Sequence, residues 1–236
     1  MFIIEVIPIV RAIASETLSY FTSQEVPLGA IVTVPLRKKL IQGIVIGIRQ
    51  AADMKSAIKN ASFALKKLEK IKSNEFFTES FMEMTRTVAD YYASSLGSVL
   101  DIIVPDYILK NTTKLKIDKS APYIRKNLHE KYAVQGDDTE RYATWKSLIR
   151  QEFAKKKSLL FIFPTIEEAE YAFTLLEKGI GNYTILLHGG LTQKKIIETW
   201  NSIMKESHPV AIITTGGFLS IPREDIETIV VERENS

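Results

Sequence analysis

The sequence contains no cysteine and only three histidines, His129, His188 and His208. Without cysteine the chain cannot form disulfides or thiolate metal sites. The histidines and carboxylates are not grouped at the spacings of metal ligands, so we expect no metal and no other cofactor. No stretch approaches the roughly 20 apolar residues that a membrane-spanning helix requires. The apolar run at the start is interrupted by Glu5 and Pro8, so it predicts a strand and not a signal peptide. We therefore expect a cytoplasmic protein with no membrane partner.

The composition is that of an ordinary globular chain. Of its 236 residues, 45% are hydrophobic and 25% are charged, which is typical of a chain with enough apolar material for two modest cores. Disorder is not indicated.

Residues 31–48 organise the N-terminal part of the chain. Two runs rich in β-branched residues flank Arg37, Lys38 and Lys39, a pattern that predicts two strands joined at a positively charged turn. Residues 31–72 contain ten Lys or Arg against two acidic residues, a local net charge of +8, whereas the whole chain carries +3. Such an excess attracts phosphate backbones, but a solvated basic surface without a partner has the same composition. Charge alone leaves both interpretations open.

Further strands and one clear helix are predicted around this hairpin. Residues 2–10 and 18–21 are typical of strands, and residues 63–71 fit either a strand or a short helix. Residues 51–60 are polar and permit a helix. Helical spacing of apolar side chains predicts a helix with a core-facing stripe made of Phe77, Phe81, Met84, Val88 and Tyr91. The stripe could also stack bases, although at helical spacing it is far more typical of core.

The pattern changes after Pro105. Residues 99–105 are expected to lead out of the first domain, and residues 107–131 hold seven Lys or Arg against two acidic residues, which predicts a basic, partly extended linker. Beyond it, short apolar runs alternate with helical patterns, which predicts a parallel sheet with helices on its faces. The expected strands are residues 158–163, 183–187, 210–214 and 226–231, and the expected helices are residues 139–156, 166–178 and 192–205.

Two domains are therefore expected. Residues 1–106 should form a small β-rich, barrel-like α+β domain, residues 107–131 the linker, and residues 132–236 an α/β lobe. Because the chain stops directly after the last predicted strand, we expect that lobe to be incomplete.

Three patterns in the second half have both a functional and a structural interpretation. A turn at residues 136–141 follows a short predicted strand at residues 132–134 and precedes a helix, as a phosphate-binding loop would, but its acidic residues would repel phosphates, so we predict a helix cap. His188 follows a strand without an identifiable catalytic partner, so its two following glycines are expected to form a tight turn. Carboxylates near the last strand could hold Mg²⁺, but Arg233 competes for them, and a surface ion pair fits equally well.

Several segments, taken in order, resemble the family of the replication-restart helicase PriA, also called primosomal protein N′. In the first domain they are Thr17-Leu-Ser-Tyr20, Val32-Thr-Val-Pro-Leu-Arg37, Gly43-Ile-Val45, Ala89-Asp-Tyr-Tyr92 and Gly97-Ser-Val-Leu100. In the second half they are Leu186-Leu-His-Gly-Gly-Leu191 with Trp200, residues 213–219 and Ile229-Val-Val-Glu-Arg-Glu-Asn235. The resemblance implies a 3′-DNA-end-binding domain followed by a RecA-like helicase lobe.

The sequence departs from the family pattern in the residues for ATP hydrolysis and in those for binding the DNA end. The phosphate-loop Lys of the family has no counterpart at residues 136–141, and Arg233 stands where the hydrolytic Glu of the Asp-Glu-Glu-His box would be, which implies a loss of ATP hydrolysis. A winged-helix domain, zinc-binding cysteines and a second helicase lobe are absent from the sequence. In the end-binding pocket, Ser19 aligns with the Asp that accepts the terminal sugar hydroxyl, Arg37 with a pocket Gly, and Lys66 with a basic pocket residue.

We therefore predict a DNA-binding protein of the replication-restart type that is not itself an enzyme. Its partners would be single-stranded or forked DNA, including a 3′ end, and other replication-restart proteins. The alternatives are a fragment of an ATP-dependent helicase whose other regions are missing, and a non-catalytic adaptor whose basic surface binds an acidic protein. Phosphates would be bound by the cations, the terminal sugar by Ser19, and the last base by two apolar neighbours, so the predicted DNA-binding residues are Ser19, Tyr20, Leu36, Arg37, Lys38, Lys39, Lys66 and Lys67.

Overall fold

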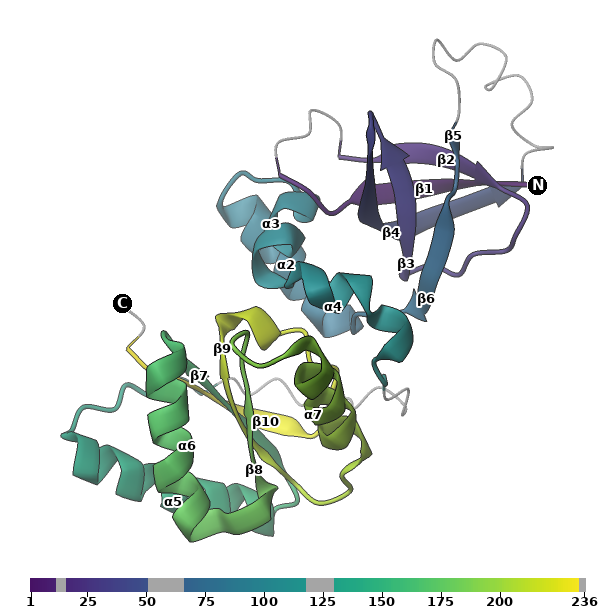
Figure 1. The fold of residues 1–236 in the computed structure, drawn as a ribbon. Helices are drawn as coiled ribbons and strands as arrows, with labels where there is room; N and C mark the ends of the chain where they lie inside the picture. Colours follow the sequence, from purple (N-terminus) through teal and green to yellow (C-terminus); the bar gives the residue numbers. More distant parts are fainter. Residues whose placement is uncertain (12–15, 51–65, 118–129, 234–236) are drawn as a thin grey trace. The chain divides into compact units, whose positions relative to one another are not determined.

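The computed structural model describes residues 1–11, 16–50, 66–117 and 130–233. The chain divides into two compact units, Met1–Lys114 and Leu115–Ser236. Figure 1 shows the helices and strands of each unit. The expected order, a β-rich unit followed by an α/β unit, is confirmed. The predicted linker residues 118–129 and the helix-permissive residues 51–60 lie outside the described residues.

The first unit is built on a six-stranded sheet with the order β5-β2-β1-β4-β3-β6. The four long strands are antiparallel neighbours: β1 (Phe2–Pro8), β2 (Leu18–Thr22), β3 (Ala30–Leu36) and β4 (Lys39–Gln50). The predicted hairpin at residues 31–48 is therefore β3 and β4. Figure 1 shows these strands wrapped around one another above three short helices.

One segment closes this sheet into a small barrel. The strands β5 (Lys66–Lys67) and β6 (Lys70–Glu75) are successive parts of that segment, and they pair with β2 and β3, at opposite ends of the four-strand order. Between them, the Leu68 amide donates to the Phe21 carbonyl at 2.9 Å, and the Glu69 amide donates to the Thr33 carbonyl at 3.2 Å. Closure leaves fewer unpaired strand edges. Of the ambiguous residues 63–71, Lys66–Lys67 and residues 70–71 are strand, while residues 63–65 lie outside the described residues.

The barrel interior follows from the alternation of side chains along each strand. Alternate residues point to opposite faces of a strand, so the residues that share one buried cluster mark the inward positions. Gly43 is required where β4 crosses β1, since a Cβ there would lie 2.4 Å from a methyl carbon of Val6. The inward cluster contains Ile4, Val6, Tyr20, Val26, Ala30, Val32, Val34, Val45 and Leu68.

Three helices complete the first unit: α2 (Glu79–Tyr91), α3 (Leu96–Ile103) and α4 (Asp106–Lys110). Thr78 caps α2, because its hydroxyl accepts from the Phe81 amide at 3.2 Å. The predicted core stripe of this helix is wrong in part, since Met84 is 38% and Tyr91 is 81% exposed. The buried face contains Phe81, Met82, Thr85 and Ala89.

Residues 99–105 do not lead out of the unit as expected. They belong to α3 and its end, because Ser95 caps the helix and Leu96, Val99 and Leu100 bury at helical spacing. The next residues also remain on this unit, since Ile108 and Leu109 of α4 are buried. A 3₁₀ turn at Thr112–Lys114 follows. The first compact unit thus extends past residue 106, into the segment that was predicted as linker.

The second unit contains a four-stranded parallel sheet with the order β10-β7-β9-β8. The strands are β7 (Ser158–Phe163), β8 (Thr184–Leu187), β9 (Ala211–Thr215) and β10 (Ile226–Val231). The helices are α5 (Asp138–Ala154), α6 (Ile166–Ile180) and α7 (Gln193–Lys205). Short 3₁₀ turns lie at Gly181–Tyr183 and Gly216–Phe218. This confirms the predicted alternation, but residues 131–137 contain no strand, so the strand predicted at 132–134 is wrong.

Helices lie on both sides of this sheet (Figure 1). The helices α5 and α6 pack on the sheet face formed by Leu159, Phe161 and Phe163. Trp145 of α5 and Leu176 of α6 belong to the same buried cluster. Trp200 of α7 is fully buried, and its indole donates to the Lys116 carbonyl at 2.9 Å. The Lys116 amide in turn donates to the side-chain oxygen of Asn201 at 2.7 Å. Helix α7 therefore anchors the first residues of the second unit. No described helix is long and apolar enough to cross a membrane.

Candidate nucleic-acid interface

The hairpin tip carries three of the predicted DNA-binding cations. Leu36 and Lys39 form its last strand pair, so Arg37 and Lys38 make a two-residue turn. Arg37 has a φ of 53°, the positive value that the turns favoured in such hairpins require at their first central position. All three cations are exposed. None of them forms an ion pair with a described carboxylate.

Lys66 and Lys67 lie at the same end of the barrel as the hairpin tip. Lys70 pairs with Thr33, and because β6 runs antiparallel to β3, the residues before Lys70 lie toward the tip. Lys66 also pairs with Tyr20 on β2. The Tyr20 hydroxyl donates to the Pro35 carbonyl at 3.2 Å, which joins this strand to the end of β3. Five cations from two segments distant in sequence therefore lie around one end of the barrel.

Tyr20 belongs to the barrel core. Its side chain is 3% exposed and packs among the inward residues, and burial raises the pKa of its hydroxyl. A ring so deeply buried has little surface on which a nucleotide base could stack. Its role in the geometry is to hold the last residues of β3, directly before the cationic turn. Leu36 is half-buried at the same end.

Strand alternation separates the remaining predicted residues onto two surfaces. Lys66 has the inward parity of Leu68 and Tyr20, so it lies at the barrel opening with Leu36 and Lys39. Ser19 and Lys67 have the outward parity and lie on the outer wall. Two residues that the sequence analysis does not single out share this wall, Glu5 and Arg49, whose side chains pair at 3.1 Å. Only the register of β1, β2 and β4 identifies them, since their sequence context is that of ordinary strands.

The turn predicted as a helix cap in the second unit is confirmed as one. The Asp137 carboxylate accepts from the Glu140 amide at 2.9 Å at the start of α5. Arg141, one turn later, donates to Asp138 at 2.7 Å and pairs with Glu232 at 2.9 Å. The helix start is therefore occupied by carboxylates and by a guanidinium that neutralises them.

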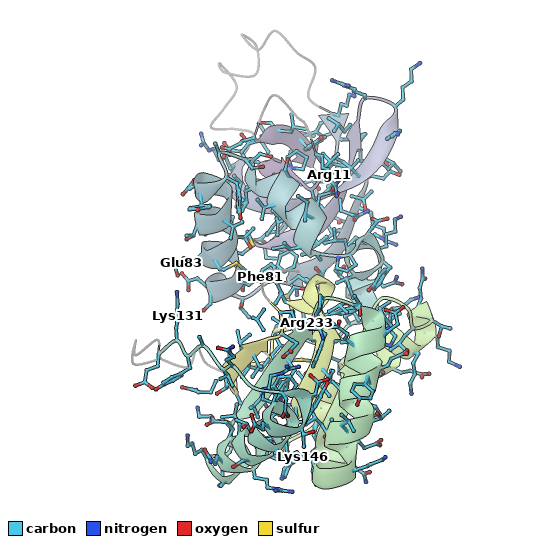
Figure 2. The ribbon with its side chains drawn as sticks, turned by 90° about the vertical axis from the view of Figure 1, so that its left-hand side faces the viewer. Arg11, Phe81, Glu83, Lys131, Lys146 and Arg233 are labelled. Carbon is cyan, nitrogen blue, oxygen red and sulfur yellow. The ribbon has the colours of Figure 1, made fainter. Side chains whose placement is uncertain are left out.

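The residues after β10 join the same charged group. Burial raises the pKa of Glu232, and the neighbouring Arg141 and Arg233 oppose that rise. Arg233, labelled in Figure 2, pairs with Glu168 of α6 at 2.9 Å. The ion-pair interpretation of this segment therefore fits Glu232 and Arg233, while residues 234–235 lie outside the described residues. Among the described residues no group of three His, Asp or Glu could hold a metal ion.

His188 has a structural environment. Its side chain is 3% exposed, and its Nδ1 accepts from the Gly190 amide at 3.2 Å, as the predicted tight turn requires. The Nε2 atom lies 3.5 Å from a carboxylate oxygen of Glu170. A Cβ at Gly190 would approach the imidazole to 3.1 Å, so the glycine is needed for this packing.

The fold and the site define a class of protein in which a small closed β barrel with cations around one end is followed by a parallel α/β unit. Residues 6–105 match the family model of the 3′DNA-binding domain (3′BD) of PriA. Two curated relatives from two strains of Helicobacter pylori, each named replication restart protein PriA, are 24% identical to this chain over 232 residues. These matches cover 92% of this chain and 35% of each relative, so the chain spans about a third of their length.

Residues 6–105 therefore match the 3′DNA-binding domain of PriA, and the similarity to PriA relatives covers most of the chain. The family predicted from the ordered motifs is confirmed. The matched region coincides with the barrel and the helices α2 and α3 of the first unit.

Proposed function

We propose that this chain binds DNA through the end of its N-terminal barrel and acts in replication restart. The observation that carries the proposal is the convergence of Arg37, Lys38 and Lys39 with Lys66 and Lys67, all exposed, at one end of a domain of the 3′DNA-binding family. Exposed cations without carboxylate partners are available to phosphates, and neutralising phosphates releases counterions. The partner would be single-stranded or forked DNA with a 3′ end.

The predicted residues take different roles under this proposal. The turn cations and Lys67 bind phosphates, and Lys66 contributes at the barrel opening beside Leu36, which packs on the terminal base. Ser19 meets the terminal sugar, because a hydroxyl both donates and accepts hydrogen bonds. Tyr20 acts indirectly, by fixing the end of β3 through its bond to Pro35.

A variant in which Arg37, Lys38 and Lys39 are all replaced by Ala tests the proposal. We expect its affinity for a single-stranded oligonucleotide, measured by fluorescence anisotropy, to fall at least tenfold at low salt. The slope of log K against log salt should shrink by about 2, since each cation removed contributes about 0.7 for single strands. A matched control replaces three exposed lysines of the second unit, Lys178, Lys194 and Lys195. Equal losses in both triple variants, or none in the first, would refute the assignment.

Under this proposal the second unit acts as a scaffold and does not hydrolyse ATP. A phosphate-binding loop needs amides and an ammonium directed at the phosphates, whereas α5 begins with Asp137 and Asp138 and with Arg141 already paired to two carboxylates. We expect no ATP turnover above background, with or without forked DNA, in a coupled phosphate-release assay. Turnover stimulated by forks would instead favour the alternative, an active helicase fragment. Under this proposal the first expected domain, residues 1–106 extended by helix α4, binds DNA. The second expected domain, residues 132–236, does not hydrolyse ATP.

A further inference from the structure

The outer side of β6 carries two lysines that do not belong to the predicted DNA-binding set. Lys70 pairs with Thr33, whereas the next residue, Ile71, packs against the core cluster. Because side chains alternate along a strand, Lys70 points to the outer wall of the barrel. Lys72 follows Ile71, and its backbone lies about 6–7 Å from that of Lys70, two steps of an extended strand. Successive phosphates along an extended nucleic-acid strand have a similar separation.

The segment around α4 brings a third lysine to this wall. The Lys72 ammonium donates to the Lys110 carbonyl at 3.3 Å, so the end of α4 lies beside β6. The 3₁₀ turn Thr112–Lys114 follows and also lies against β6. Figure 1 shows β6 running from β5 down to the level of α4. Lys114, from the segment predicted as a basic linker, is exposed there. Two basic segments that are separate in the sequence therefore meet along β6.

The neighbouring charges define the course of this surface. The Lys110 ammonium pairs with Asp106 within α4, so its charge is already balanced. An ammonium has three donors, so Lys72 keeps two after its bond to the Lys110 carbonyl. Glu75 ends β6 and is exposed, and its carboxylate would repel phosphates. An anionic strand that leaves the barrel opening along β6 would therefore turn away from Glu75, toward Lys114.

We propose that Lys70, Lys72 and Lys114 form a phosphate-binding surface, the β6 track, which holds the part of a DNA strand that lies outside the barrel opening. The inference rests on the proposed DNA binding at the hairpin tip and the opening, and it adds a separate surface that lengthens the bound strand. Residues 67–72 span about 17 Å of extended strand, enough for about three nucleotides beyond the opening. Because phosphate contacts carry no sequence information, the track binds any base sequence.

The test compares a short and a long single-stranded oligonucleotide, a tetranucleotide and a dodecanucleotide, by competition in fluorescence anisotropy with the full chain. The double variant Lys70→Gln, Lys72→Gln should bind the long oligonucleotide about tenfold more weakly than the wild type and the short one equally well. For the long oligonucleotide alone, the slope of log K against log salt should shrink by about 1.4, since each ammonium contributes about 0.7. The control Arg11→Gln, Arg86→Gln removes two exposed cations of the same unit and should change neither affinity.

Lys114→Gln gives a second, independent variant, because Lys114 lies outside β6. It should also weaken binding of the long oligonucleotide alone, and circular dichroism would verify the fold of each variant.

The outcomes separate the track from the proposed function. If the wild type binds neither oligonucleotide, the proposed function fails and this inference fails with it. If the double variant binds the long oligonucleotide as the wild type does, or loses affinity equally for both lengths, DNA binding stands and the track is refuted. If polyglutamate of equal charge displaces the long oligonucleotide as effectively as unlabelled DNA does, the surface takes an acidic polypeptide and the inference is overturned.

Discussion

At the scale of single residues, neighbouring side chains on strand β2 face opposite sides of the barrel wall. Ser19 faces outward and Tyr20 faces into the barrel, although both belong to one motif in the sequence. The Tyr20 ring fills the core, and its hydroxyl reaches the Pro35 carbonyl at 3.2 Å. Arg37 occupies a left-handed turn position, a conformation that costs a side-chain-bearing residue about 1 kcal/mol. Its charge is thus placed at the tip at some expense of stability.

Tyr20→Phe is predicted to lower the free energy of unfolding by about 1 kcal/mol, the usual net value of one hydrogen bond, while the ring continues to fill the core. Chemical denaturation measures the change. Tyr91→Phe is the matched control, because the Tyr91 side chain is 81% exposed and its loss of a hydroxyl should have no effect. Equal stability of the Tyr20→Phe variant and the wild type would show that the bond to Pro35 contributes nothing.

At the scale of elements, the contact between α3 and β1 fixes how the helices sit on the barrel. A Cβ at Gly97 would lie 2.0 Å from the Pro8 carbonyl oxygen, a backbone atom that cannot move without shifting the strand. Glycine here allows the helix to approach the strand closely. This explains why helix α3, which begins at Leu96, tolerates a poor helix former in its first turn.

Gly97→Ala is predicted to destabilise the protein by about 1–3 kcal/mol, the usual cost of overpacking. Gly216→Ala, where an added Cβ would meet no atom within 4 Å, should be nearly neutral and serves as the control. Thermal denaturation followed by circular dichroism compares the two. A Gly97→Ala variant as stable as the control would mean that α3 adjusts its position on β1 at no cost.

At the scale of the whole molecule, the two units depend on different interactions. The first unit is stabilised by its closed barrel. The second is stabilised by a parallel sheet and by one nearly buried arginine that joins several segments. Arg223, 8% exposed, pairs with Asp225 at 2.7 Å and donates to the carbonyls of Glu206 and His208, each at 2.9 Å. These acceptors lie after α7, where a cation also complements the helix dipole.

Arg223→Met is predicted to destabilise the second unit by about 3–5 kcal/mol, because Asp225 and the carbonyls would lose their partner while remaining partly buried. Arg233→Met, at a site 58% exposed, should cost about 1 kcal/mol or less, as exposed ion pairs do. Denaturation monitored by Trp145 and Trp200, both in the second unit, reports the effect. Similar losses in the two variants would contradict the difference in burial.

The sequence by itself determined the order of elements, since the period of the apolar residues distinguishes strands from helices. It located β7 and β10 and placed the cations on the β3–β4 turn. It also indicated the family, because the motifs recur in order. It misassigned residues 99–105 and the exposed side of α2, where periodicity marks an apolar residue without showing what lies opposite it.

Only the tertiary structure decided which distant residues meet. Closure of the barrel by residues 66–75 brings Lys66 beside Tyr20, and the register of three strands brings Glu5 beside Ser19. Neither contact follows from spacing along the chain. A shift of one residue in strand pairing would turn every side chain to the other face, so it is the packing of the core that fixes which polar groups share a surface.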